Sequence, residues 1–125
     1  MAVTYTNAVK IARMNAVTTA IGATGVLEIG TTGMGTVLAT IPLANPAAGT
    51  ATGAGVLTLT LPLTDSSADA TGTAAAARIR TASGGTDIVT GLTVGTSGSD
   101  INLNNTSIAT GQTVTLTSAT ITHAT

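Results

Sequence analysis

Apolar residues alternate with polar or small residues along most of the chain after Gly22. The clearest case is Leu57–Thr64, in which four leucines alternate with three threonines and a proline. Residues 37–43 and 88–94 follow the same period, with Ile88, Thr90, Leu92 and Val94 on one face of the second segment. Alternation with one apolar face is typical of a half-buried β-strand. The pattern therefore predicts several short strands separated by turns.

Three further segments complete this prediction. Val26–Ile29 is predicted as a short strand, and Val114 and Leu116 begin a last strand. We expect a bulge near Ser118-Ala119 in that last strand, because Ile121 falls on the opposite phase. Residues 73–81 contain four consecutive alanines, which favour a helix, and then Arg78-Ile79-Arg80, which favours a strand. We predict a strand there. Residues 44–55 are rich in glycine, alanine and proline, and we expect an exposed loop that contacts a neighbouring molecule.

The first 22 residues have a different pattern. Ile11, Met14, Val17 and Ile21 recur at helical spacing. We predict one helix over residues 8–21, capped by Asn7 and stopped by Gly22. Residues 1–22 thus form a helical segment, packed on the chain's own sheet or swapped onto a neighbour, and residues 23–125 form a single β domain. The predicted fold is mainly β, an antiparallel β-sandwich or small barrel with one N-terminal α-helix.

The low content of aromatic residues limits the apolar area that the predicted core can bury. Hydrophobic residues make up 43% of the chain, but aromatic residues make up 1%, and Tyr5 is the single aromatic side chain. Aromatic side chains usually contribute much of the buried area of cores and interfaces. A core of aliphatic residues, alanine and threonine methyl groups buries less area per residue. We therefore expect the chain to gain further burial from a partner or from a homo-oligomer.

The charge of the chain narrows the classes of partner. Charged residues make up 7% of the chain, against about 25% in an average protein. The net charge is −1 and the chain has four basic residues, so nucleic-acid binding, which needs a basic patch, is not expected. No run of about 20 predominantly apolar residues predicts a membrane span, and residues 10–20 are too polar for a secretory signal. Cysteine is absent, which excludes disulfides and thiolate metal sites.

Catalytic and metal-binding motifs are scarce. His123 is the only histidine, and a triad with Asp87 or Asp100 would need a rigid C-terminal tail. Asp100, Asn102 and Asn104 alternate, as Ca²⁺ ligands can, and Asp65 and Asp69 share one turn. No glutamate follows at the bidentate position of a calcium loop, and these residue types are common in turns. The glycine-dense residues 22–35 lack a phosphate-binding motif. We expect no catalytic residue, no metal and no cofactor.

The four basic residues are the candidates for an assembly interface. Arg78 and Arg80 share one face of the predicted strand. They form either an ordinary solvated face or a pair that binds an acidic partner, since the guanidinium binds carboxylates in a bidentate manner. Lys10 and Arg13 lie on the predicted helix. That helix either packs on its own sheet or serves as an arm that docks on another subunit.

Four stretches of the sequence carry a resemblance to a known family. They are residues 15–22 (NAVTTAIG), 67–74 (SADATGTA) and 95–104 (GTSGSDINLN), and the ending Thr120-Ile121-Thr122. In order and spacing they resemble small virion proteins of tailed bacteriophages, across nearly the whole chain. Residues 75–77, all alanine here, depart from the bulky aromatic residues that the family often carries.

The resemblance implies a non-enzymatic structural role, most specifically a head decoration or cement protein. Such a protein binds the major capsid protein on the outer surface of the virion head and bridges its subunits, after synthesis in the cytoplasm of the host bacterium. The alternative is a tail, neck or head-fibre module that binds a host receptor or glycan. Glycan binding commonly uses aromatic stacking, for which Tyr5 alone is poor material.

Overall fold

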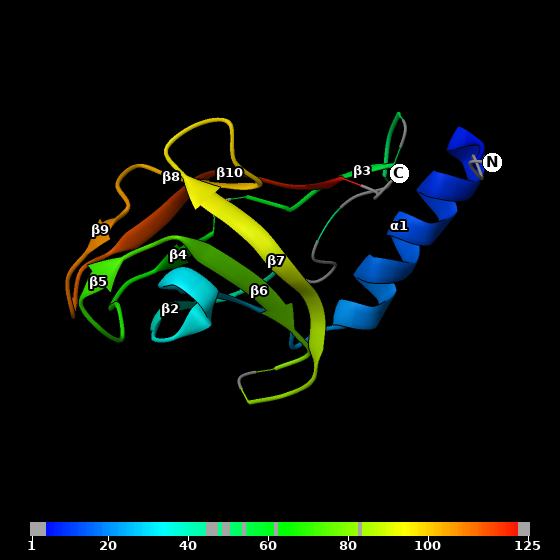
Figure 1. Ribbon diagram of the computed structural model, residues 1–125. Helices are drawn as coiled ribbons and strands as arrows, with labels where there is room; N and C mark the ends of the chain where they lie inside the picture. The colour runs from blue at the N-terminus through cyan, green and yellow to red at the C-terminus, as the bar shows by residue number, and fades with distance from the viewer. Residues whose placement is uncertain are drawn as a thin grey trace.

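The protein is mainly β, with one helix at its N-terminal end (Figure 1). The computed structural model describes residues 5–44, 48, 51–53, 55–61, 63–82 and 84–122. Its elements are α1 (Asn7–Ile21), β1 (Val26–Gly30), the 3-10 turn η1 (Thr32–Met34), β2 (Val37–Pro42), β3 (Val56–Thr58), β4 (Thr64–Asp65), β5 (Gly72–Thr73), β6 (Ala76–Arg80), β7 (Asp87–Gly95), β8 (Ile101–Leu103), β9 (Ser107–Ile108) and β10 (Val114–Thr122). This confirms the predicted fold class.

One large sheet makes up most of the molecule. Its strand order is β2-β1-β6-β7-β8-β10-β3, and β4 also pairs with β10. All of these pairs are antiparallel except β7 with β8, which is parallel. The sheet curls into a half-barrel, and β5 and β9 form a separate two-stranded sheet at the end far from α1 (Figure 1).

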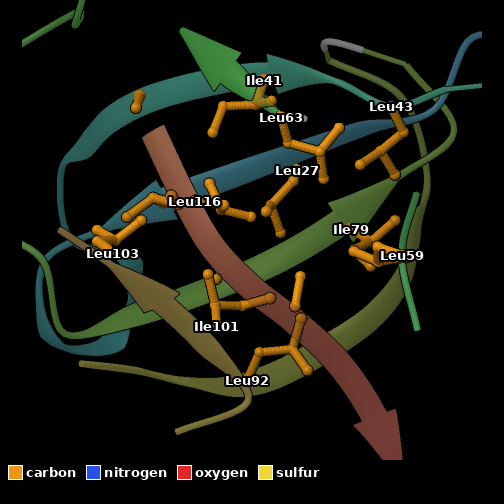
Figure 2. Close-up of a cluster of buried hydrophobic side chains, with 14 of the residues drawn as sticks. Leu27, Ile41, Leu43, Leu59, Leu63, Ile79, Leu92, Ile101, Leu103 and Leu116 are labelled. Carbon is orange, nitrogen blue, oxygen red and sulfur yellow. The ribbon is translucent and has the colours of Figure 1, made fainter. Parts of the chain in front are cut away.

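The core fills the inside of the curled sheet with aliphatic side chains. Ile41, Leu27 and Ile79 are aligned across β2, β1 and β6, and all three are fully buried. Side chains from β7, β8 and β10 point into the same space from the other side (Figure 2). Because successive residues of a strand face opposite sides, this register also decides which residues lie on the outer face.

The two ends of the curled sheet meet along a seam that is closed by side chains. Where β2 faces β4, the Asp65 carboxylate accepts a hydrogen bond from the Thr40 amide at 3.1 Å. The Thr40 hydroxyl donates to Asp69 at 3.0 Å, and the Asp69 amide donates to the Leu38 carbonyl at 2.7 Å. Aspartates thus satisfy the free edge of β2, where another strand would otherwise pair.

Helix α1 packs on its own chain. Met14 and Ile21 are buried in the same cluster as the sheet residues, and Ile11 and Val17 pack against that cluster. The helix begins one residue earlier than predicted: Thr6 is the cap, and its hydroxyl accepts a hydrogen bond from the Val9 amide. The prediction that Asn7 is the cap was therefore wrong.

The prediction of a strand rather than a helix in residues 73–81 is confirmed. The structure has two strands in this region, β5 and β6. In β7, by contrast, the predicted face holds only in part: Leu92 is buried and Ile88 and Val94 pack against the core, but Thr90 does not. The β6–β7 register shifts between Ala77 and Ile79 and again between Ile79 and Arg80, so β7 carries extra residues. As a result Val89 and Leu92 lie opposite the inward residues of β6, and Thr90 is exposed.

The alternating segment 57–64 is not one strand. Its ends pair with β10 as β3 and β4, and Leu57, Leu59 and Leu63 are buried. Leu59 is hydrogen-bonded to Ala119 of β10, and Leu63 to Leu116 of β10. Leu63 follows Leu59 by four residues, whereas Ala119 follows Leu116 by only three, so this segment has one residue more than β10. The extra residue forms a bulge, which leaves Leu61 40% exposed. Pro62 lies outside the described residues.

Two further predictions concern loops and bulges. In the segment 44–55, the described residues Ala48 and Ala51 are buried, and the Ala51 amide donates to Asn15 of α1 at 2.8 Å. The expectation of an exposed loop was therefore wrong for these residues. The bulge in the last strand is confirmed: the β10–β8 register shifts between Leu116 and Ser118.

Candidate functional site

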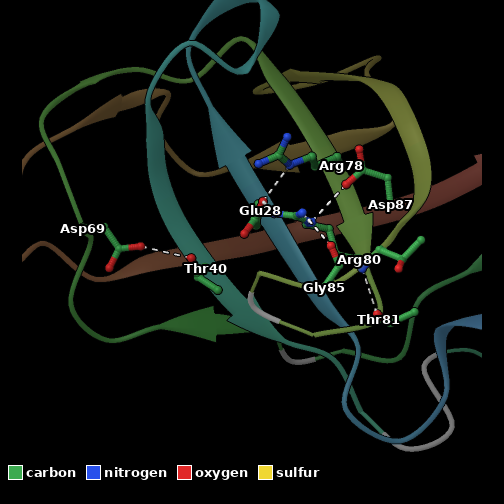
Figure 3. A network of polar contacts seen from close by, with 9 residues as sticks. Glu28, Thr40, Asp69, Arg78, Arg80, Thr81, Gly85 and Asp87 are labelled. Carbon is green, nitrogen blue, oxygen red and sulfur yellow. Dashed lines mark hydrogen bonds and ion pairs between the residues drawn. The ribbon is translucent and has the colours of Figure 1, made fainter.

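A cluster of charged side chains lies on the outer face of the sheet, at the strands β1, β6 and β7. The register places Glu28 directly opposite Arg78, and Arg80 directly opposite Asp87. Directly opposed residues of antiparallel strands have Cβ atoms about 4.5–5.5 Å apart, so the strand pairing itself brings opposite charges at these positions into contact. The alternation that sends Leu27 and Ile79 inward therefore also assembles this cluster outside (Figure 3).

Glu28 is the centre of the cluster. Arg78 Nε donates to Glu28 Oε1 at 2.6 Å, and Arg80 Nη1 lies 3.6 Å from the same oxygen. Arg80 Nε lies 2.9 Å from Asp87 Oδ1, outside hydrogen-bond geometry, and Arg80 Nη2 donates to the Gly85 carbonyl at 2.5 Å. Glu28 is only 5% exposed, since the two arginines cover it.

Arg78 and Arg80 are thus compensated within the chain. Two guanidinium groups face two carboxylates, so the cluster has no net charge. The arginine side chains are about one quarter and one fifth exposed, which differs from a freely solvated face. The shared face that the sequence predicted is present, and its main contacts in this chain are Glu28 and Asp87.

A hollow of about 270 Å³ lies beside the cluster, between η1 and the strands β6 and β7. Its lining includes Met34, Ala76, Arg78, Asp87 and Thr90. Met34 has a φ of 59°, which is uncommon for a residue other than glycine. The charged groups at this hollow are those already paired in the cluster, so it presents small and aliphatic groups beside a neutral ion network.

The other carboxylates are also engaged. Asp100 Oδ2 accepts from both the amide and the hydroxyl of Thr93, at 3.0 and 3.1 Å. Asn102 bonds to Ser99 and to Ser118. Of the candidate calcium ligands, Asp100 and Asn102 therefore hold the turn between β7 and β8, whereas Asp65 and Asp69 bond to β2. Among the described residues, no three histidine, aspartate or glutamate side chains are grouped as a metal site. His123 lies outside the described residues.

Lys10 and Arg13 are separated from this network. Both lie in the N-terminal half of α1, and neither has a carboxylate within ion-pair distance in the described part of the chain. The Arg13 guanidinium lies 4.9 Å from the centre of the Tyr5 ring. The structure therefore divides the four sequence candidates into a compensated pair on the sheet and an uncompensated pair on the helix.

The carboxylate partners of the two arginines were not predicted from the sequence. Glu28 is the single charged residue within an otherwise apolar run, and such a residue needs an opposite charge if its strand is buried. That signal was available, but only the strand order shows that β6 lies next to β1. Asp87 carried no comparable signal.

Comparison with known proteins gives no relative for this chain. No family model, no curated protein and no solved structure matches it. No helix in the described residues is long and apolar enough to span a membrane.

Proposed function

We propose that the chain is a non-enzymatic structural protein of a tailed bacteriophage, and specifically a decoration or cement protein. It would bind the major capsid protein on the outer surface of the head and bridge neighbouring subunits. The sequence resemblance to small virion proteins motivates this proposal. The distribution of charge in the structure is the observation that supports it best.

All five carboxylates of the chain are bound by the chain's own groups. Glu28 and Asp87 pair with arginines, Asp65 and Asp69 close the seam, and Asp100 holds a turn. Each carboxylate would have to give up its present partner before it could act as a catalytic acid or base on a substrate. What remains at the surface is mostly threonine, serine and glycine, which suits a protein that becomes covered by neighbours.

Repetition would supply the strength of binding. A decoration protein occupies many equivalent positions on a shell, so modest contacts at each position add up when one molecule or oligomer touches several subunits. A half-barrel with an aliphatic core provides a rigid body for such contacts, and the low content of charged residues limits repulsion between adjacent copies.

The copy number of the chain in purified virions tests this proposal. Quantitative mass spectrometry should give a ratio to the major capsid protein of about one to one, or one to two or three. A handful of copies per particle would instead support the tail, neck or fibre alternative. Absence from the particle would refute a structural role in the virion.

A further inference from the structure

The outer side of α1 combines the two uncompensated cations with exposed apolar side chains. Tyr5 and Val9 are 44% and 43% exposed, and they are two of the three large apolar side chains exposed in the described residues. Arg13 follows Val9 by one helical turn and contacts the Tyr5 ring. Lys10, half-buried, lies at the edge of the same area. We call Tyr5, Val9, Lys10 and Arg13 the α1 patch.

The positions of the cations do not stabilise the helix itself. The N-terminal end of a helix carries a partial positive charge, so acidic residues are favourable there and basic residues near the C-terminal end. Helix α1 has no acidic residue in its first turn and no basic residue in its last turn. Lys10 therefore adds positive charge to the first turn of α1, where the helix is already positive, and Arg13 follows one turn later without an acidic partner on the helix.

No acidic side chain in the described part of the chain pairs with these two cations. Outside α1 there are five carboxylates against two arginines, a net charge of −3, but every one of those carboxylates is engaged where it lies. The molecule is thus polarised, with its free positive charge concentrated on one helix.

We propose that the α1 patch is the docking surface for an acidic partner protein, one that presents carboxylates beside apolar side chains. Under the function proposed above, on which this inference rests, that partner is the capsid subunit. A second copy of this chain that presents the same surface is a poorer occupant, because facing α1 patches would bring cations together. The cation–π contact with Tyr5 holds Arg13 in place, which lowers the entropy lost when a carboxylate binds.

The test uses heads of the phage from which the gene for this chain has been deleted. The purified protein is added and its attachment is measured by co-sedimentation as an apparent Kd. The variant Lys10→Gln/Arg13→Gln removes both cations, and neither side chain takes part in an ion pair within the described chain. The control Thr96→Glu/Thr113→Glu changes the net charge equally at two exposed positions away from α1.

We expect the double glutamine variant to bind about tenfold more weakly and the control to bind like the unmodified protein. The variant Lys10→Arg/Arg13→Lys should retain attachment, and binding of the unmodified protein should weaken between 0.15 and 0.5 M salt. Equal binding of all variants, or an equal loss in the control, would overturn the α1 patch while leaving the decoration role in place. Failure of the unmodified protein to attach would overturn the decoration role and, with it, this partner.

Discussion

The stability of the sheet should depend on the carboxylate of Glu28. This side chain is 5% exposed and faces two guanidinium groups, with Arg78 Nε at 2.6 Å and Arg80 Nη1 at 3.6 Å from the same oxygen. The substitution Glu28→Gln keeps the size of the side chain and one acceptor oxygen, but it removes the charge. Arg80 then keeps the carboxylate of Asp87, and Arg78 is left without an ion-pair partner among the described residues.

The expected cost follows from how far each group is buried. Removing one partner of a buried ion pair costs about 3–5 kcal/mol, and one hydrogen bond to a charged group contributes about 1.5–3 kcal/mol. Arg78 and Arg80 keep 25% and 21% of their side chains exposed, so water can solvate part of the charge left without a partner. We therefore expect Glu28→Gln to lower the free energy of unfolding by about 2 kcal/mol.

Urea unfolding followed by far-ultraviolet circular dichroism measures this change. With a slope of about 1.5 kcal/mol per molar urea, the midpoint should fall by about 1.3 M. The control Asp69→Asn alters an exposed carboxylate and should cost less than about 0.5 kcal/mol, because asparagine keeps an oxygen that can accept from the Thr40 hydroxyl. A shift for Glu28→Gln no larger than that of the control would refute the reasoning, as would a shift that disappears in 1 M salt, where exposed pairs are screened.

Two other substitutions test the ends of elements. Gly22, which ends α1, has φ of 71° and ψ of −158°, a backbone conformation that is nearly exclusive to glycine. Gly22→Ala should therefore lower the free energy of unfolding by about 2 kcal/mol, although the added Cβ would meet no atom within 4 Å. A urea midpoint equal to that of the unmodified protein would contradict this. Asp65→Ala removes the acceptor of the Thr40 amide. Hydrogen exchange measured by nuclear magnetic resonance should therefore accelerate about tenfold at the Thr40 amide and remain unchanged at the Leu27 amide. Unchanged exchange at Thr40 would mean that the carboxylate does not close the seam.

The secondary structure was predictable wherever one local signal acted alone. The helix ends at Gly22 as predicted, and the strand at residues 76–80 formed despite its alanines, because Ile79 belongs to the core and the arginines beside it face outward. The errors fall where bulges change the phase. In β7 and in residues 57–64 the alternation continues in the sequence, but an extra residue in the pairing determines which side faces the core.

The candidate site was predictable only as a set of residue types. The sequence places Arg78 and Arg80 on one face, but Glu28, the partner at the centre of the cluster, lies on a strand 50 residues away in the chain. Pairing of this kind follows from strand order, which a period of two does not specify. The same holds for the seam, where turn aspartates satisfy the edge of a strand that precedes them by 25 residues or more.

The location of the single tyrosine has a practical consequence for spectroscopy. Tyr5 is the chain's only aromatic residue, and it lies exposed at the start of α1, against Arg13 and away from the aliphatic core. Intrinsic fluorescence will therefore report the surroundings of that helix and respond little to loosening of the sheet. A change in the tyrosine emission of the purified protein would thus be a label-free signal of events at α1, separate from loosening of the sheet.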